Sequence, residues 1–223
     1  MAGNNPRQDL VDCIRMLEKA DYIDHNGHCS IRRDGASFYI NSGASIRSTL
    51  TVDDIVTVDL DGNLVEGSAR QPLEYHIHSE VYRARPNVGA VAHTHPKWST
   101  FLTMTGHALK PIYAQGTLVC DAAVLDTPMS VNTRPMGEKM AAALGDKPVV
   151  LLKAHGAVAT GGDILECFAR AAYIEETAYR QYMAMQIGDM YEFTKEEQAA
   201  CREKLATPSL FRKTWDYYYA KLP

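Results

Sequence analysis

Two histidines at the end of an apolar run have the types and spacing of metal ligands. Residues 88–92 (Val-Gly-Ala-Val-Ala) lead into His93, Thr94 and His95, and such a run is typical of a buried strand. Because side chains alternate between the two faces of a strand, an H-x-H pair puts both imidazoles on one side. Two neutral imidazoles aimed at one point can bind a cation. The alternative is a pair of half-buried strand histidines bonded to backbone groups.

A third histidine and a glutamate extend this pattern. His155 follows a second apolar run, residues 149–152, and two strand ends can converge at one edge of a sheet. Three imidazoles leave a coordination position open, as in catalytic metal sites. The pattern predicts one divalent ion per subunit on His93, His95 and His155, and such ligands suit Zn, Fe, Co or Mn; zinc is the first choice. Glu74 is then a fourth ligand or an acid/base beside the metal; otherwise it is a first-turn helix residue favoured by the helix dipole.

The hydrophobic periodicity predicts an α/β chain without repeats or linkers, so we expect a single domain over residues 1–223. Helices are predicted at residues 7–22, 72–85, 97–105, 135–144 and from Asp163, as N-cap, to about Ile187. Strands are predicted at residues 28–33, 37–41, 53–59, 63–66, in a run ending at 93, near 111–115, and at 148–153 and 156–160. These elements indicate a sandwich with a mostly antiparallel central sheet flanked by helices.

Composition excludes several classes of protein. A net charge of −4 without any Lys/Arg run disfavours nucleic acid as a partner. No apolar stretch approaches the roughly 20 residues that a membrane span needs, and the first residues lack the basic and apolar blocks of a signal peptide. The five cysteines are scattered and odd in number, which favours free thiols in a reducing cytoplasm. We therefore expect a cytoplasmic protein that acts on a small molecule.

Several segments carry a recognisable family pattern. These are residues 71–78 (QPLEYHIH), 85–96 (RPNVGAVAHTHP) and 154–156 (AHG), flanked by 27–32, 50–56 and 61–63. Together they resemble the class II aldolase/adducin family over about residues 8 to 190. The resemblance implies a class II aldolase-like fold, a metal on the three histidines, and a cyclic homotetramer with active sites between subunits. That family contains aldolases, epimerases, decarboxylases, a dehydratase and non-enzymatic members, so the reaction stays open.

Departures from the family pattern bear on the substrate. Sugar-phosphate members commonly hold the phosphate with an Asn after the first glycine, a Thr-Gly turn and a Ser-Ser pair before the catalytic Glu. Here the first position is His28, the pair is Pro72-Leu73, and the turn is altered. Since a phosphate dianion needs several convergent donors, these changes argue against a phosphorylated substrate. The candidate substrate-binding residues are His28, Ser42, Gly43, Arg47 and Leu73.

The first functional hypothesis is a metal-dependent carbon–carbon lyase that decarboxylates a hydroxylated aromatic acid such as a dihydroxyphthalate. Arg47 and His28 would hold a second carboxylate, and Leu73 would give an apolar wall for a flat ring. Glu74 or a tyrosine would protonate the ring carbon. The candidate tyrosines are Tyr113 and the C-terminal Tyr217, Tyr218 and Tyr219.

Two alternatives stay open. An aldolase would use Glu74 to form an enediolate from a hydroxy-keto compound or sugar phosphate, and Tyr113 to protonate the leaving aldehyde. A non-enzymatic, adducin-like module would keep the fold without the chemistry, although all three histidines and Glu74 are present here. Metal content after dialysis separates the module from the enzymes, and the released product separates the two enzymes.

Overall fold

The computed structural model describes residues 5–223, and its centre is an eight-stranded sheet. The strands, in the order β4-β3-β2-β1-β5-β8-β7-β6, are β1 His28–Arg32, β2 Ser37–Asn41, β3 Ile55–Asp59, β4 Leu64–Glu66, β5 Ala90–Thr94, β6 Ala123–Leu125, β7 Val149–Leu152 and β8 Gly156–Gly161. Only β6 and β7 pair in parallel; every other neighbouring pair is antiparallel. The predicted α/β fold with a mostly antiparallel central sheet is confirmed.

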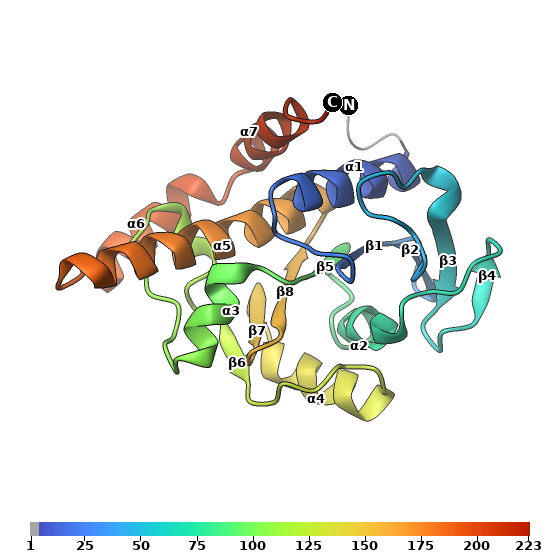
Figure 1. The fold of residues 1–223 in the computed structure, drawn as a ribbon, viewed down its shortest axis with the longest axis horizontal. Helices are drawn as coiled ribbons and strands as arrows, with labels where there is room; N and C mark the ends of the chain where they lie inside the picture. Colours follow the sequence, from blue (N-terminus) through green and yellow to red (C-terminus); the bar gives the residue numbers. More distant parts are fainter. Residues whose placement is uncertain (1–4) are drawn as a thin grey trace.

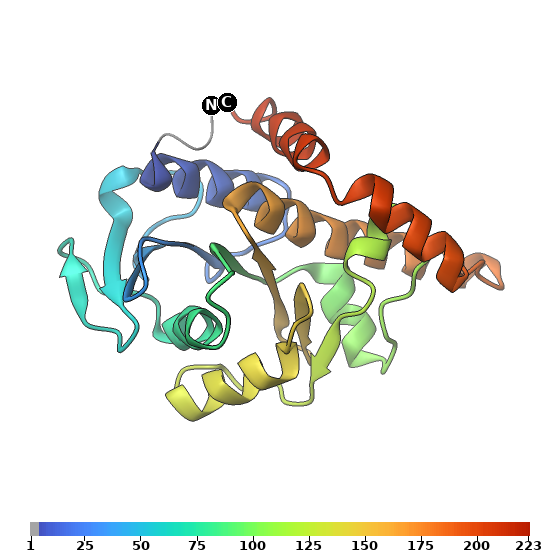
Figure 2. The same cartoon turned by 180° about the vertical axis from the view of Figure 1, so that it is seen from behind.

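Helices cover both faces of the sheet, as Figures 1 and 2 show. They are α1 Pro6–Lys19, α2 His76–Ala84, α3 Lys97–Met104, α4 Arg134–Leu144, α5 Ile164–Ile187, α6 Lys195–Leu205 and α7 Pro208–Tyr219. Side chains of α1, α5 and α7 form one buried apolar cluster with one face of the sheet. Those of α2 and α4 form a second cluster with the other face. The sheet is therefore enclosed by two separate cores.

Local sequence signals account for most of the helix boundaries. Asn5 accepts hydrogen bonds from the amides of Arg7 and Gln8, and Pro6 occupies the first turn of α1. Asp163 caps α5 as predicted, accepting from the amide of Glu166. All five predicted helices are present, although the one expected at 72–85 is divided into a 3₁₀ turn, Leu73–Tyr75, and α2.

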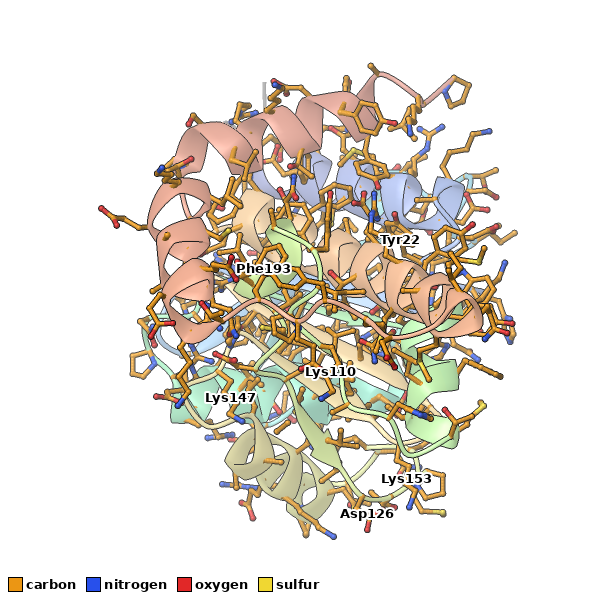
Figure 3. All side chains as sticks on the ribbon, turned by 90° about the vertical axis from the view of Figure 1, so that its left-hand side faces the viewer. Tyr22, Lys110, Asp126, Lys147, Lys153 and Phe193 are labelled. Carbon is orange, nitrogen blue, oxygen red and sulfur yellow. The ribbon has the colours of Figure 1, made fainter. Side chains whose placement is uncertain are left out.

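The strand predicted near residues 111–115 is wrong. The amide of Lys110 donates to the side chain of Gln181 on α5, and the carbonyl of Pro111 accepts from the amide of Phe193. These backbone groups thus bond to α5 and to the segment between α5 and α6 instead of a neighbouring strand; Lys110 and Phe193 are labelled in Figure 3. The edge strand is instead β6, where Asp126 just beyond it pairs with Lys153 at 2.6 Å.

The C-terminal aromatic residues form part of the core. Trp215 and Tyr218 on α7 are buried, and both rings make edge contacts with Phe168 on α5. Tyr217 and Tyr219 point outward and are exposed. No helix in residues 5–223 is long and apolar enough to cross a membrane.

A buried carboxylate fixes the start of α3. Glu175 on α5 accepts hydrogen bonds from the amides of Trp98 (2.7 Å) and Ser99 (3.0 Å) and is 5% exposed. Replacing Glu175 by Ala leaves both buried amides without an acceptor, so we expect the free energy of unfolding to fall by about 3 kcal/mol. Urea denaturation followed by circular dichroism measures this. The exposed Glu203→Ala on α6 is the matched control; equal stability of both variants would refute the role of Glu175.

Candidate metal centre

Four side chains from three parts of the chain converge at the edge of the sheet formed by strand ends, where β5 ends and β8 begins. One ligand atom from each of Glu74, His93, His95 and His155 lies within 4.8 Å of all the others. The Nε2 atoms of His93 and His95 are 3.0 Å apart, and Glu74 Oε2 lies 3.5 Å from Nε2 of His93. Nε2 of His155 lies 3.8 Å from the other oxygen of Glu74. This spacing and donor set fit a single divalent ion.

Backbone geometry holds the histidines at this edge. β5 and β8 pair with Thr94 opposite Ala157, which places His155 beside the end of β5. Gly156 allows this approach, because a Cβ there would lie 2.2 Å from the carbonyl oxygen of Thr94. Ala154 adopts the left-handed region with φ of 53°, a strained conformation for a residue with a Cβ. The hydroxyl of Thr103 on α3 accepts the amide hydrogen of Ala154 at 3.0 Å.

Hydrogen bonds behind the histidines fix which ring nitrogen faces the centre. His93 donates from Nδ1 to the carbonyl of Ala157 at 3.1 Å, and His95 donates from Nδ1 to Asp24 at 2.9 Å. Both Nε2 atoms therefore carry lone pairs, and these point at one another across 3.0 Å. Two facing lone pairs repel unless a cation lies between them. This pattern of outer hydrogen bonds is the usual support of metal-bound histidine.

The electrostatics also suit a cation. Burial lowers the pKa of His95, although Asp24 opposes the shift, and burial lowers the pKa of His155. Burial alone would raise the pKa of Glu74, but hydrogen bonding and charge at His93 outweigh it and lower the value to about 2. These shifts favour neutral imidazoles at His95 and His155 and an ionised carboxylate at Glu74 at neutral pH, which are the protonation states that bind metal. Nδ1 of His155 is buried without a hydrogen-bond partner among the described residues.

Asp24 is a supporting residue that sequence reasoning missed. Nothing in the sequence around Asp24 indicates that it contacts His95, which lies 71 positions later. Replacing Asp24 by Ala removes the acceptor that orients His95, so we expect metal affinity to fall by about 10- to 100-fold. Competition with a chromogenic zinc chelator measures this affinity. Asp189→Ala, at an exposed site, is the control. An unchanged affinity in Asp24→Ala would contradict the assignment.

A cavity of about 390 Å³ opens beside the cluster. Its wall includes four of the predicted substrate residues, His28, Gly43, Arg47 and Leu73. Ser42 is buried next to the wall without lining it. Sequence reasoning missed four polar or amide-bearing residues that line it, which are Asn26, Gln71, Ser130 and Asn132.

Arg47 is a buried cation without an acidic partner. Its side chain is 4% exposed; Nε donates to the carbonyl of Gly27 at 2.6 Å and Nη1 donates to the carbonyl and hydroxyl oxygens of Ser45. Among the described residues, no carboxylate lies within ion-pair distance of Arg47, and its Nη2 has no hydrogen-bond partner. A buried guanidinium is normally paired with an anion, and Arg47 lines the cavity beside the cluster, from which an anion can reach it.

Three backbone amides of the turn before Arg47 are hydrogen-bonded within the protein. The amide of Ser42 donates to the carbonyl of Asp54 at 2.8 Å, and the amide of Gly43 donates to the carbonyl of Arg70 at 2.9 Å. The amide of Ser45 closes a local turn onto Ser42. These three N–H groups are therefore engaged within the protein, and Arg47 supplies the charge of this wall.

The candidate tyrosines lie elsewhere. Tyr113 donates to Glu176 at 3.2 Å, and the guanidinium of Arg180 stacks 4.0 Å from the centre of its ring. Tyr218 shares hydrogen bonds with Tyr22 (2.7 Å) and Glu176 (2.9 Å). None of these tyrosines lines the cavity of its own chain, so a catalytic role for Tyr113 stays a prediction that needs a neighbouring subunit.

Comparison with known proteins decides the family. The model of the class II aldolase and adducin N-terminal domain matches residues 8–182. The chain belongs to the class II aldolase and adducin family. Class II aldolases use a divalent metal, in agreement with the His/Glu cluster at the sheet edge.

Relatives in this class II aldolase family carry different activities. The chain is 27% identical over 172 residues to an L-fuculose phosphate aldolase of Methanocaldococcus jannaschii, covering 77% of this chain and 92% of that protein. It is 31% identical over 166 residues to a 3,4-dihydroxyphthalate decarboxylase of Arthrobacter keyseri, covering 68% of this chain and 67% of that protein. The L-fuculose 1-phosphate aldolase structure from Glaciozyma antarctica PI12 superposes with a TM-score of 0.86 over 97% of this chain and 88% of that one. At 21% identity this last likeness shows the fold alone.

Proposed function

We propose that this protein is a metal-dependent decarboxylase of a hydroxylated aromatic dicarboxylate, such as a dihydroxyphthalate. The observation that carries the proposal is the unpaired, buried guanidinium of Arg47 in the same cavity as the His/Glu cluster. A carboxylate matches the fork of a single guanidinium. A phosphate dianion would call for further donors, and the amides of Ser42, Gly43 and Ser45 are engaged elsewhere.

The shape of the wall and the relatives support the same substrate class. Leu73 is 82% exposed and lines the cavity next to Pro72, so a flat ring would cover apolar surface there. Two relatives, at 31% and 30% identity, are named 3,4-dihydroxyphthalate decarboxylase.

The four converging residues would have different roles in the reaction. His93, His95 and His155 would hold the ion, preferably zinc, with Glu74 at its side. When bound, a divalent ion withdraws electrons from oxygens that chelate it. Arg47 would hold the carboxylate that is retained and so orient the ring. Breaking the bond between the ring and the other carboxylate releases carbon dioxide and leaves an electron pair on the ring carbon, which must receive a proton.

Glu74 is the nearest group for that proton transfer. Its Oε1 accepts the amide hydrogen of Val131 at 2.8 Å, which fixes the carboxylate at the cavity wall. Because Glu74 is ionised at rest, it would first take the proton of a phenolic hydroxyl as the substrate binds and then deliver it to the ring carbon. The cluster remains unchanged after the cycle.

A neighbouring subunit would bring the tyrosines to the cavity. We propose the homotetramer implied by the family, with active sites between subunits. Tyr217 and Tyr219 are exposed and free to contact another chain, whereas Tyr218 is tied to Tyr22 and Glu176. Tyr113 could act in such a neighbouring site, and loss of activity in Tyr113→Phe with unchanged metal content would support this.

Carbon dioxide release tests the proposed reaction directly. The zinc-loaded protein is incubated with a panel of dihydroxyphthalates and dihydroxybenzoates, and released carbon dioxide and the ring product are measured. We expect release from at least one dihydroxyphthalate. The absence of release from every compound, with metal still bound, would contradict the proposal.

An aldolase is the second candidate, because the relatives named as L-fuculose phosphate aldolase match most of the chain. The polar side chains of Asn26, Ser130 and Asn132 in the cavity wall would suit the hydroxyls of a polyol. In this reaction Glu74 would abstract the proton that gives an enediolate. Aldehyde release from a hydroxy-keto compound or sugar phosphate, without carbon dioxide release, would favour it.

A further inference from the structure

A chain of four buried side chains runs from the cavity wall into the core. Nδ1 of His28 lies 2.7 Å from Nε2 of His78, and Nδ1 of His78 lies 2.6 Å from Oγ of Ser30. Oγ of Ser30 lies 2.7 Å from the hydroxyl of Tyr82. All four residues are at most 2% exposed. The proposed reaction uses none of the three residues behind His28.

The sheet register and α2 account for this alignment. His28 and Ser30 are two residues apart on β1, so both side chains point to the face that α2 covers. His78 and Tyr82 are four residues apart on α2, so they lie one above the other on a single helix face. β1 pairs with β5 so that His28 is opposite His93, and their ring centres are 5.0 Å apart. The chain therefore ends next to the metal cluster.

The hydroxyl of Tyr82 sets the direction of the hydrogen bonds. Within residues 5–223 its only hydrogen-bond partner is Ser30, and a buried phenol without an acceptor is costly. Tyr82 thus donates to Ser30, so the hydroxyl hydrogen of Ser30 is directed to Nδ1 of His78. His78 then carries its proton on Nε2 and donates to Nδ1 of His28.

We infer that His28 presents a protonated Nε2 to the cavity, as a neutral donor whose tautomer is fixed by His78, Ser30 and Tyr82. Nδ1 of His28 is taken by His78, so Nε2 is the ring nitrogen left for the cavity that His28 lines. Burial lowers the pKa of His78 to about 3, in agreement with a neutral ring that donates from Nε2. His28 is thus a donor without charge, in contrast to Arg47.

This assignment makes His28 a specificity residue and the three residues behind it positioning residues. A donor fixed in one tautomer selects a substrate oxygen that accepts, such as a carboxylate, carbonyl or phenolate oxygen, and disfavours a group that can only donate. The substrate part of the inference rests on the proposed function. The hydrogen-bond direction does not, because it follows from Tyr82 alone.

Nitrogen NMR tests the direction without any substrate. Two-bond ¹H–¹⁵N correlation spectra of zinc-loaded, ¹⁵N-histidine-labelled protein report which nitrogen of each ring is protonated. The His28 signals are assigned by their loss in His28→Gln. We expect protonated Nε2 and unprotonated Nδ1 in the wild type. In Tyr82→Phe we expect both signals to move toward the average of two tautomers, since Ser30 can then accept from His78. Protonated Nδ1 in the wild type, or no change in Tyr82→Phe, would overturn the inference.

Steady-state kinetics test the consequence for the substrate. With the dihydroxyphthalate that is turned over, Tyr82→Phe should raise KM about two- to tenfold, the loss expected for one weakened hydrogen bond, with less change in kcat. Tyr173→Phe is the matched control, because it removes the hydroxyl of another buried tyrosine, which bonds Thr214 away from the cavity. Equal KM for both variants would refute the specificity role. Ser30→Ala breaks the same chain and serves if Tyr82→Phe does not fold.

The turnover assay and the NMR experiment test separate claims, so either claim can be contradicted alone. If no compound of the panel is turned over but His28 carries its proton on Nε2, the proposed function is wrong and the hydrogen-bond direction stands. If turnover is found but His28 is protonated on Nδ1, the proposed function stands and the inference is wrong.

Discussion

Replacing His93 by Ala is expected to abolish retention of divalent metal and to lower turnover at least about 1000-fold. His93 is fully buried, its Nε2 lies 3.0 Å from that of His95, and Glu74 lies 3.5 Å away. Without it, the imidazoles of His95 and His155 and the carboxylate of Glu74 remain. The Lewis-acid contribution that would be lost is several kcal/mol, and each 1.36 kcal/mol corresponds to a factor of ten in rate. Elemental analysis after dialysis and carbon dioxide release from the panel measure the two effects.

His107→Ala is the matched control for His93→Ala. His107 is exposed, and its Nδ1 lies 2.9 Å from the hydroxyl of Thr105. This variant should keep both metal and turnover. Full metal content in His93→Ala would show that the cluster is not the binding site. Lost metal with unchanged turnover would show that the reaction does not use it.

Replacing Arg47 by Gln is expected to raise KM for a dicarboxylate about 10- to 100-fold, with a smaller effect on kcat. Hydrogen bonds to charged groups contribute about 1.5–3 kcal/mol, and binding of a carboxylate that does not react affects ground state and transition state alike. Gln keeps an amide donor for the carbonyls of Gly27 and Ser45, which Arg47 now bonds. Steady-state kinetics with a dihydroxyphthalate and with the matching monocarboxylate measure the change.

The monocarboxylate separates recognition from damage to the fold. A compound without the second carboxylate should lose little in Arg47→Gln, because its missing group is the one that Arg47 would hold. Arg33→Gln, at a surface arginine paired with Glu66 at 2.7 Å, controls for the loss of charge. An equal rise of KM for both compounds would mean that Arg47 supports the turn instead of binding the substrate.

Periodicity in the sequence was sufficient to predict an α/β fold and the convergence of the three histidines, whereas Glu74 was added through the family resemblance. The H-x-H spacing and the second apolar run place His93, His95 and His155 at strand ends, and strand ends meet at a sheet edge. The failed prediction near residues 111–115 has a different cause. The backbone at Lys110 and Pro111 is hydrogen-bonded to the side chain of Gln181 on α5 and to the amide of Phe193 beyond α5, and such tertiary contacts override local propensity.

Contacts between residues far apart in the chain were beyond sequence reasoning. Asp24 supports His95 only because the loop after α1 passes the end of β5. His78 on α2 is hydrogen-bonded to His28 and Ser30 on β1, which lie 50 and 48 residues earlier in the chain. The burial of Arg47 depends on its hydrogen bonds to the carbonyls of Gly27 and Ser45. No local pattern specifies any of these contacts.

The absence of a side chain at Gly156 gives a criterion for sorting relatives by sequence. Any larger residue would place a Cβ 2.2 Å from the carbonyl of Thr94, and β5 and β8, whose ends adjoin His95 and His155, would have to separate. A family member that keeps all three histidines but has a bulkier residue at this position should therefore be catalytically silent. Such a member would have a scaffolding role without catalysis, although its three histidines alone would lead a reader of its sequence to classify it as an enzyme.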